Sequence, residues 1–254
     1  MWTDMRSRLR TVVPDALRRI WRRWKIAAIR NQNRGRNPDD IFNEIYAKNS
    51  WGGDQGTFHS GSGSTGNHAH LYAEAIKNFI REYDVRRVVD LGCGDFRVGA
   101  QLLGTGIEYI GIDIVENLVG ENQRLYGDGR VSFRCSNIIE DELPEADLCL
   151  IRQVLQHLSN DQIVRVMRNV NRYRYVLVTE HYPAPGVVRQ KNVDKPCGED
   201  VRVYDDSAVY LDAPPFNQRV SGPLLDVDAG HYLVQRGERI RTYLIEHDPA
   251  MAAL

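Results

Sequence analysis

The residues best suited to chemistry follow a short apolar stretch, residues 88–91, that contains Asp90 and leads into the turn Gly92-Cys93-Gly94. Glycine at both ends of this turn lets the backbone bend sharply and lets a ligand approach without a Cβ in the way. A dinucleotide-binding loop needs a third glycine three residues after the second, and that position is Arg97. The spacing therefore disfavours a dinucleotide and leaves the ligand open.

Two further polar positions end the next two strand-like stretches. Asp113 lies 19 residues beyond Gly94, where a carboxylate can accept both hydroxyls of a ribose. Ser136 and Asn137 follow the next stretch, where a side-chain amide can hydrogen-bond an adenine edge. Ligands of open α/β sheets bind beyond the carboxyl ends of the strands. The order and spacing of these groups together predict a site for a nucleoside-containing ligand.

From residue 86 onward, predicted strands and helices alternate along the chain, and these elements must position the residues named above. The patterns predict strands over 86–92, 108–114, 131–138, 146–153 and 173–182, and helices over 97–104, 115–127 and 160–172. Such alternation indicates a parallel sheet with helices on both faces. Two β-rich runs around residues 236–239 predict an antiparallel hairpin within 230–247 that completes the sheet.

The segments before the sheet differ in composition. Residues 1–36 form a basic arm with eleven Lys and Arg against two Asp, and Leu17, Ile20, Trp21 and Trp24 have the spacing of one helical stripe. This helix would suit an anionic membrane surface, its own domain or a second subunit. The Gly/Ser-rich residues 37–70 are expected to be a lid over cofactor or substrate. The last segment is 71–254, and its first residues predict an amphipathic helix with Leu71, Ala75, Ile76 and Phe79 on one side.

Charge and cysteine usage exclude several classes. The formal net charge is -1 and the chain beyond the arm is net acidic, so we expect no nucleic-acid partner. The four cysteines have no C-x-x-C spacing, which indicates reduced thiols. His68 and His70 lack a further ligand in the sequence, so we expect no metal site. No apolar run approaches the ~20 residues of a membrane span. We expect a cytoplasmic protein, with a peripheral contact at the inner membrane face as the alternative that the arm allows.

In these motifs the sequence resembles the class I S-adenosylmethionine-dependent methyltransferases. VVDLGCGDF (88–96) resembles their first motif, YIGIDI (109–114) the next segment, and ADLCLIRQVLQHLS (146–159) the motif around their fourth strand. The resemblance covers residues 70–182. It is closest to bacterial methyltransferases associated with glycan and polysaccharide genes, through SGSGS (60–64), RQVLQHLS (152–159) and PPF (214–216). It implies a Rossmann-like, seven-stranded, mostly parallel sheet with an antiparallel C-terminal hairpin and helices on both faces, with 71–254 as the methyltransferase domain.

The resemblance also implies S-adenosylmethionine as cofactor and the residues that would bind it. The chain departs from the family's pattern at Phe96, which is often a third glycine, and at Asn137 and Gln153, which are usually Asp. The implied cofactor-binding residues are Asp90, Gly92, Cys93, Gly94, Asp113, Ile114, Asn137, Ile138, Arg152 and Gln153.

Methyl transfer is an in-line displacement, and a hydroxyl acceptor benefits from a general base. His181, directly after the fifth predicted strand, is the first candidate, with Glu180 as its orienter or as an alternative base, and His157 is the second. Tyr182 and Arg202 are predicted substrate contacts, Arg202 in the irregular segment 183–212. The predicted function is O-methylation of a sugar hydroxyl in a bacterial glycan or glycolipid. The alternatives are a small-molecule N-methyltransferase and a non-catalytic binding module.

Overall fold

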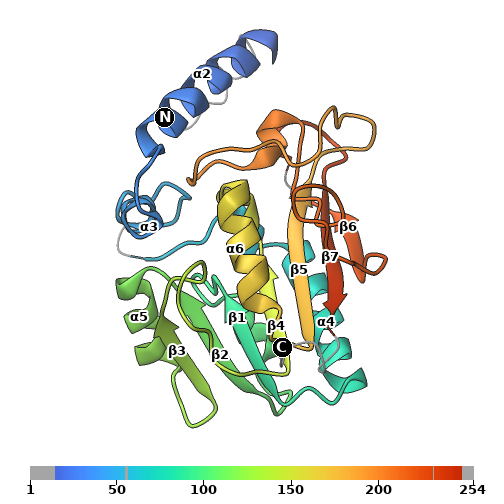
Figure 1. Ribbon diagram of the computed structural model, residues 1–254. Coiled ribbons are helices and arrows are strands. Elements are labelled where there is room, and N and C mark those ends of the chain that lie inside the picture. The colour runs from blue at the N-terminus through green and yellow to red at the C-terminus, as the bar shows by residue number, and fades with distance from the viewer. Residues whose placement is uncertain (1–14, 55–56, 231, 248–254) are drawn as a thin grey trace.

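The computed structural model describes residues 15–54, 57–230 and 232–247, with side chains from Trp21 onward. Its centre is one seven-stranded sheet in the order β3-β2-β1-β4-β5-β7-β6 (Figure 1). β7 runs antiparallel to both of its neighbours, and the other pairs are parallel. The predicted fold class is therefore confirmed. The strands are β1 (Arg87–Leu91), β2 (Glu108–Asp113), β3 (Val131–Cys135), β4 (Leu148–Arg152), β5 (Tyr175–Tyr182), β6 (Leu225–Asp228) and β7 (Arg239–Glu246).

Helices cover both faces of the sheet, α6 (Asn160–Val170) on one and α4 (Asn67–Glu82) on the other, while α5 (Glu116–Tyr126) lies beside β3 (Figure 1). Successive strand residues point to opposite faces, so each strand contributes to two cores. On the α6 side the core includes Val89 and Ile151, and on the α4 side it includes Val88 and Leu150.

Two predicted elements differ in the structure. Residues 97–104 do not form a regular helix but a single 3-10 turn, Gly99–Leu102, because Leu103 is extended and Gly104 has φ +86°. The hairpin is present, but its first strand is β6 at 225–228 rather than the run beginning at residue 230. The amides of Leu233, Val234 and Gln235 donate to the buried carboxylate of Glu238 instead of to a strand.

The helix predicted to begin at residue 71 is α4, which begins at Asn67. Its buried face differs from the predicted one. Leu71 is 38% exposed, while Tyr72, Ala73, Ile76, Phe79 and Ile80 are buried. The four cysteines are free thiols, with Cys149 and Cys197 buried.

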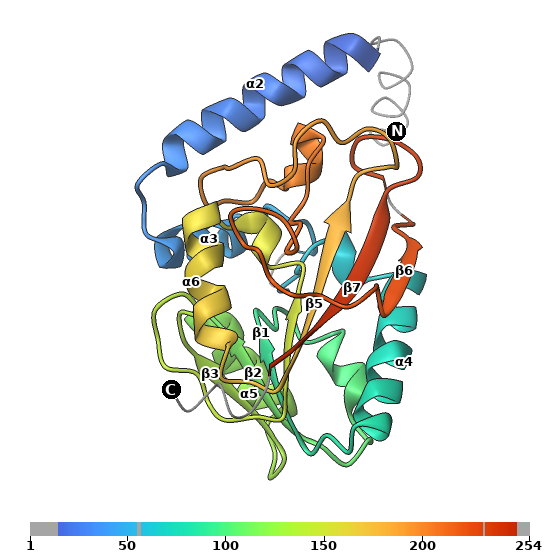
Figure 2. The ribbon, with the colours of Figure 1, turned by 45° about the vertical axis from the view of Figure 1, so that its right-hand side comes forward.

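In the described part of the chain, α2 (Asp15–Asn33) precedes the Gly/Ser-rich segment 37–70, whereas α3 (Pro38–Ala47) lies within it. The N-cap of α3 is Asn37, whose side chain accepts from the amide of Asp39, and Ile41 and Ile45 bury one face. α2 lies across the top of the molecule, above the irregular segment that follows β5 (Figure 2). In the described part of the chain, no helix is both long and apolar enough to cross a membrane.

Candidate functional site

A cavity opens at the carboxyl ends of β1, β2, β3 and β4; it is called the first cavity below. All of the predicted cofactor-binding residues line it: Asp90, Gly92, Cys93, Gly94, Asp113, Ile114, Asn137, Ile138, Arg152 and Gln153. They come from four strands and the turns after them. The carboxyl ends of parallel strands meet at one edge of the sheet, so residues 63 positions apart in sequence share one wall.

The glycine turn is held in place by the second strand and the helix after it. The amide of Gly94 donates to Oδ2 of Asp113 at 3.0 Å, and Nδ2 of Asn122 donates to the Gly94 carbonyl at 2.8 Å. Gly94 has φ +54°, and a Cβ at this position would lie 2.3 Å from Oγ of Ser60. Glycine fits here without a shift, because a Cβ would clash with the Ser60 side chain and the left-handed backbone conformation is one that other residues adopt only rarely.

Buried carboxylates, among them Asp90 and Asp113, line the first cavity. Asp90 accepts a hydrogen bond from the hydroxyl of Tyr109 at 2.5 Å, and burial raises the pKa of Asp90 to about 6. Burial also raises the pKa of Asp113, against hydrogen bonds from backbone amides that include Gly94 and Val115. A buried carboxylate near its pKa gains from a cationic partner. The cavity therefore suits a ligand that brings a positive charge to Asp90 and hydroxyls to Asp113.

Phe96 stands where the resemblance implies a glycine, and its backbone takes the conformation that favours glycine, with φ +60°. Its ring is fully buried and packs against Tyr109, Tyr126 and Phe133, outside the cavity wall. The departure therefore leaves the cavity open. Gln153, the second departure, also has a positive φ, +56°, and lies in the wall.

A strap, residues 60–64 of the Gly/Ser-rich segment, lies against the first cavity. Oγ of Ser60 accepts from the amide of Asp95 at 2.7 Å, and Nη2 of Arg152 donates to the carbonyl of Gly63 at 2.6 Å. A Cβ at Gly63 would lie 2.0 Å from Oε1 of Gln153. The strap belongs to the segment for which the composition predicts a lid, and that role stays a prediction. Sequence reasoning missed other lining residues, among them Tyr46, Trp51, Tyr72 and Asp95.

A second cavity lies next to the strap and shares a wall with the first. Trp51, Ser60, Gly63, Gln153 and His157 line both. Its remaining lining is mostly polar and includes Ser50, Ser62, Gln156, His181, Glu199 and Tyr204. Two molecules bound in the two cavities would therefore meet at the strap.

Comparison with known proteins finds one family model that matches the central part of the chain. Residues 88–174 match the family model described as a methyltransferase domain. The match covers about a third of the chain, from β1 to the residue before β5. A search of curated proteins finds no match.

The chain also resembles solved structures at low identity. Magnesium protoporphyrin IX methyltransferase from Synechocystis PCC 6803, with bound S-adenosylmethionine, is 14% identical over 84% of this chain and 100% of that chain, with a TM-score of 0.51. The 1,6-didemethyltoxoflavin-N1-methyltransferase of Burkholderia thailandensis is 17% identical over 83% of this chain and 87% of that chain, also with a TM-score of 0.51. The fold is that of the S-adenosylmethionine-dependent methyltransferases, as the sequence motifs predicted.

Human N-acetylserotonin methyltransferase, in complex with S-adenosylmethionine, is similar over 84% of this chain with 14% identity and a TM-score of 0.47. The chain spans 60% of that protein's length. The names of these relatives refer to unrelated small molecules, so the similarity does not identify an acceptor.

His181, near the end of β5, lines the second cavity. Its Nε2 lies 3.0 Å from Oε2 of Glu238, whose side chain is buried. Burial alone would raise the pKa of Glu238, but the contact with His181 and three backbone amides outweigh it and lower the pKa. Glu238 is thus a fixed carboxylate beside the ring. Sequence reasoning missed it because the hairpin was expected to begin in a different place.

His157 lines both cavities, and its Nδ1 lies 3.1 Å from the carbonyl of Gly198. A carbonyl only accepts, so we assign the proton to Nδ1. Burial and the nearby charge of Lys195 lower the pKa of His157 to about 4. His157 is therefore neutral near pH 7, with the ring of Trp51 against it at a centroid distance of 5.2 Å.

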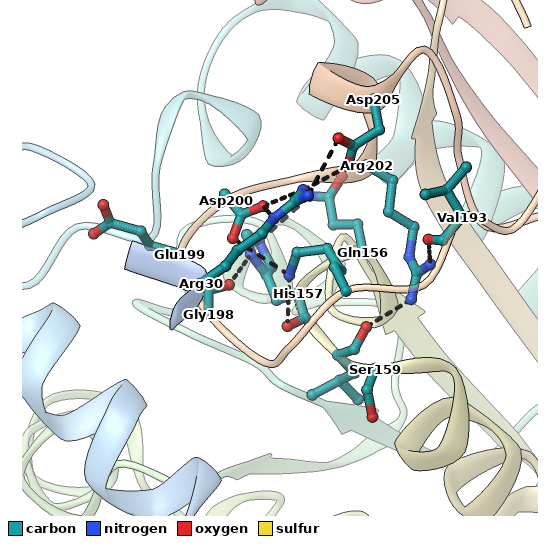
Figure 3. A network of polar contacts seen from close by, with 12 residues as sticks. Arg30, Gln156, His157, Ser159, Val193, Gly198, Glu199, Asp200, Arg202 and Asp205 are labelled. Carbon is teal, nitrogen blue, oxygen red and sulfur yellow. Dashed lines mark hydrogen bonds and ion pairs between the residues drawn. The ribbon is translucent and has the colours of Figure 1, made fainter. Parts of the chain in front are cut away.

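A polar network connects α2 to this histidine (Figure 3). Arg30 of α2 donates to Asp200 at 2.7 Å and to Asp205 at 2.5 Å, and both carboxylates belong to the segment that follows Gly198. Nζ of Lys195 lies 3.6 Å from Asp200 and donates to the carbonyl of His157. The residues around His157 are therefore fixed partly by a helix more than a hundred positions away in sequence.

Three predicted residues lie outside both cavities. Glu180 points away from His181, because neighbouring strand residues face opposite sides, and accepts from the amides of Leu155 and Gln156. Tyr182 is buried and donates to the carbonyl of Val209. Arg202 is fully buried and donates to the carbonyls of Leu158 and Val193. Each of these side chains holds a turn or loop rather than a ligand.

The remaining histidine candidates are also placed. His68 is buried in the first turn of α4 with Nε2 3.1 Å from the carbonyl of Gly63, whereas His70 is exposed. Among the described residues, no group of three or more His, Cys, Asp or Glu could hold a metal ion.

Proposed function

We propose that this protein is an S-adenosylmethionine-dependent methyltransferase that transfers a methyl group to a hydroxyl of an acceptor in the second cavity. The observation that carries the proposal is the wall that the two cavities share at Gly63, Gln153 and His157. A donor in the first cavity and an acceptor in the second would meet at this wall, as an in-line displacement requires.

The first cavity fits the chemical groups of S-adenosylmethionine. Asp90 offers a carboxylate to the positively charged methionine end, and Asp113 offers one to the ribose hydroxyls. Asn137 and Ile138 would border the adenine, one with polar atoms and the other with an apolar side chain. When bound, the cofactor supplies an electrophilic methyl group on a sulfonium.

His181 is the best placed general base for a hydroxyl acceptor. It lines the acceptor cavity, and the carboxylate of Glu238 beside its Nε2 would stabilise the imidazolium that forms when the ring takes a proton. His157 is a weaker candidate because its lowered pKa, about 4, makes it a poor proton acceptor near pH 7. His157 is better suited to orienting an acceptor hydroxyl through a hydrogen bond.

The chemistry of the second cavity favours a sugar as the acceptor. Hydroxyl, amide and imidazole side chains, among them Ser50, Ser62 and Gln156, face it together with the rings of Trp51 and Tyr204. Polar groups that exchange hydrogen bonds with hydroxyls, combined with an aromatic surface, suit a polar ring-shaped ligand. The resemblance to glycan-associated methyltransferases supports the same class, either a free glycan or a glycolipid.

Calorimetric titration with S-adenosylmethionine and S-adenosylhomocysteine is the first test. Binding that Asp113→Ala weakens at least tenfold, while Glu121→Ala on α5, outside the lining of the first cavity, does not, would support the cofactor site. Transfer of labelled methyl groups to a panel of sugars and amines then tests the acceptor. His181→Asn should abolish transfer to hydroxyls and leave cofactor affinity unchanged.

Other outcomes distinguish the alternatives. Transfer to amines that persists in His181→Asn would replace the hydroxyl proposal with N-methylation. A folded protein that binds neither cofactor nor its demethylated product would indicate a binding module on the same fold.

A further inference from the structure

The helix α2 has two faces with different environments. One face packs on its own domain: Nη1 of Arg22 donates to the carbonyl of Leu233 at 2.9 Å, Ile26 is buried, and Arg30 pairs with Asp200 and Asp205. These three residues are four positions apart, so they lie along one side of the helix. The sequence left open whether this helix contacts a membrane, its own domain or a second subunit, and in the structure this face packs on its own domain.

The opposite face carries two tryptophans that the domain does not cover. Trp21 is 68% exposed and Trp24 is 74% exposed, more than any other large apolar side chain in the described residues. Ala28 continues the same side of the helix and is also exposed. A lone exposed apolar residue is ordinary, but two adjacent tryptophans on an outward helix face are unusual for a surface in water alone.

Exposed basic residues lie near this tryptophan face. Lys25 borders the stripe, and Arg23 lies farther around the helix, toward the docked face; both side chains are exposed. Residues 1–36 have eleven basic and two acidic side chains, a formal charge of +9, so the remaining 218 residues carry about -10 to give the chain total of -1. An anionic surface would therefore attract the arm and repel the rest of the chain.

We propose that the tryptophan face of α2, Trp21, Trp24 and Ala28, binds an anionic lipid bilayer. Tryptophan rings are amphipathic and favour the interface between headgroups and acyl chains, and basic residues beside them pair with anionic headgroups. The docked face keeps its contacts with the domain, so the helix binds lying in the plane of the membrane (Figure 2). A second copy of the chain is the rival occupant of this face, and the test includes it.

The position of α2 connects the membrane to the second cavity. Arg22 contacts both Leu233 and the ring of Tyr204, at 5.1 Å from the ring centroid, and both of these residues line the second cavity. A bilayer on the outer face of α2 would thus lie one helix diameter from the acceptor cavity. This step rests on the proposed function and points to acceptors that are attached to a membrane lipid.

Vesicle co-sedimentation of the full chain tests the surface without reference to activity. We expect binding to vesicles of phosphatidylcholine with phosphatidylglycerol, weak binding to phosphatidylcholine alone, and a loss of binding as salt is raised. Trp21→Ser/Trp24→Ser and Arg23→Glu/Lys25→Glu should each lower partitioning about tenfold or more. The matched controls Leu103→Ser/Leu125→Ser and Arg81→Glu/Arg86→Glu alter exposed residues elsewhere and should change it less than twofold.

Three results would overturn the proposal. The first is that the wild type does not bind anionic vesicles, and the second is that the tryptophan variant binds them as well as the wild type. The third is that the wild type forms a dimer in light scattering, which the tryptophan variant abolishes, and does not sediment with vesicles. Thermal melting and calorimetry with S-adenosylmethionine accompany each variant, so a misfolded sample or a missing cofactor site is recognised separately from a missing membrane contact.

Discussion

Ser60 and Asp95 exchange two hydrogen bonds across 35 residues of sequence. Oγ of Ser60 accepts from the amide of Asp95 at 2.7 Å, and Oδ2 of Asp95 accepts from the amide of Ser60 at 3.0 Å. Tyr46 adds a contact between its hydroxyl and Oγ of Ser60 at 2.9 Å. The pair joins the strap, residues 60–64, to the glycine turn, so the wall between the two cavities depends on it.

Ser60→Ala is expected to weaken cofactor binding. The substitution removes the acceptor of the Asp95 amide, which costs about 1 kcal/mol or more for a mostly buried donor, and it loosens the strap over the first cavity. We expect the dissociation constant for S-adenosylmethionine to rise about five- to tenfold in calorimetry. Ser62→Ala, two residues along the same strap and exposed, is the matched control. Equal affinities in the two variants would show that the strap is held by other contacts.

The pKa of Asp90, which burial raises to about 6, predicts how cofactor affinity depends on pH. A cationic ligand prefers the ionised carboxylate, so binding near pH 6 should release a proton. Affinity should be constant above about pH 7 and fall by up to tenfold per pH unit below pH 6. Calorimetry from pH 5 to 8, in buffers of different ionisation enthalpy, measures both effects.

Asp90→Asn provides the comparison for this profile. The variant should bind less tightly at pH 8 and lose most of the pH dependence, whereas Glu145→Gln, exposed at the opposite end of the sheet, should behave as the wild type. A profile that persists in Asp90→Asn would assign the titration to another group.

The sequence alone predicted which residues at the ends of the parallel strands line the first cavity. Asp90, Asp113 and Asn137 were predicted from local patterns, because a strand's last residues reach the ligand edge of the sheet whatever the rest of the chain does. The same logic failed for Glu180 and Tyr182. Both are at the end of β5, but the alternation of strand side chains, the 3-10 turn at Leu155 and the loop at Val209 determine what they contact.

The parts that the sequence did not predict depend on contacts between distant segments. Glu238 lies beside His181 only because β7 pairs antiparallel with β5, a register that opposes His181 to Ile240. Phe96 would have counted as an obstruction, yet its left-handed backbone turns the ring into an aromatic cluster. No local pattern encodes either relationship, since each one requires the three-dimensional register of the sheet.

Arg30 is expected to matter for both stability and activity. Its guanidinium forks between Asp200 and Asp205, and its removal leaves Asp200, which is 4% exposed, with only the more distant Lys195. Breaking such a pair should lower the free energy of unfolding by about 3 kcal/mol. Because the same segment carries the carbonyl that binds His157, kcat should also fall in Arg30→Ala.

Arg30→Lys separates charge from geometry. Lysine keeps the positive charge but cannot form the fork, so both stability and kcat should recover only in part. Urea unfolding and steady-state kinetics check these values, with the exposed Arg23→Ala as the control. A kcat that is unchanged in a measurably destabilised Arg30→Ala would uncouple α2 from the site.

The raised pKa of Glu180 predicts that the stability of the protein changes with pH in the absence of any ligand. Burial raises the pKa of this carboxyl to about 8, from a reference of 4.5, despite hydrogen bonds from the amides of Leu155 and Gln156. The native state therefore holds its proton more tightly than the unfolded state. The sign follows from linkage: this group's contribution to stability is fully present below about pH 4.5, is lost as pH rises to about 8, and does not change further above that.

Glu180→Gln mimics the protonated form, so its stability relative to the wild type should increase between pH 5 and pH 8.5 in urea unfolding. Glu142→Gln, at a side chain that is 87% exposed, is the control and should give the same stability difference at both pH values. A variant that is less stable than the wild type by an equal amount at both pH values would mean that the native state favours the carboxylate held by the two amides.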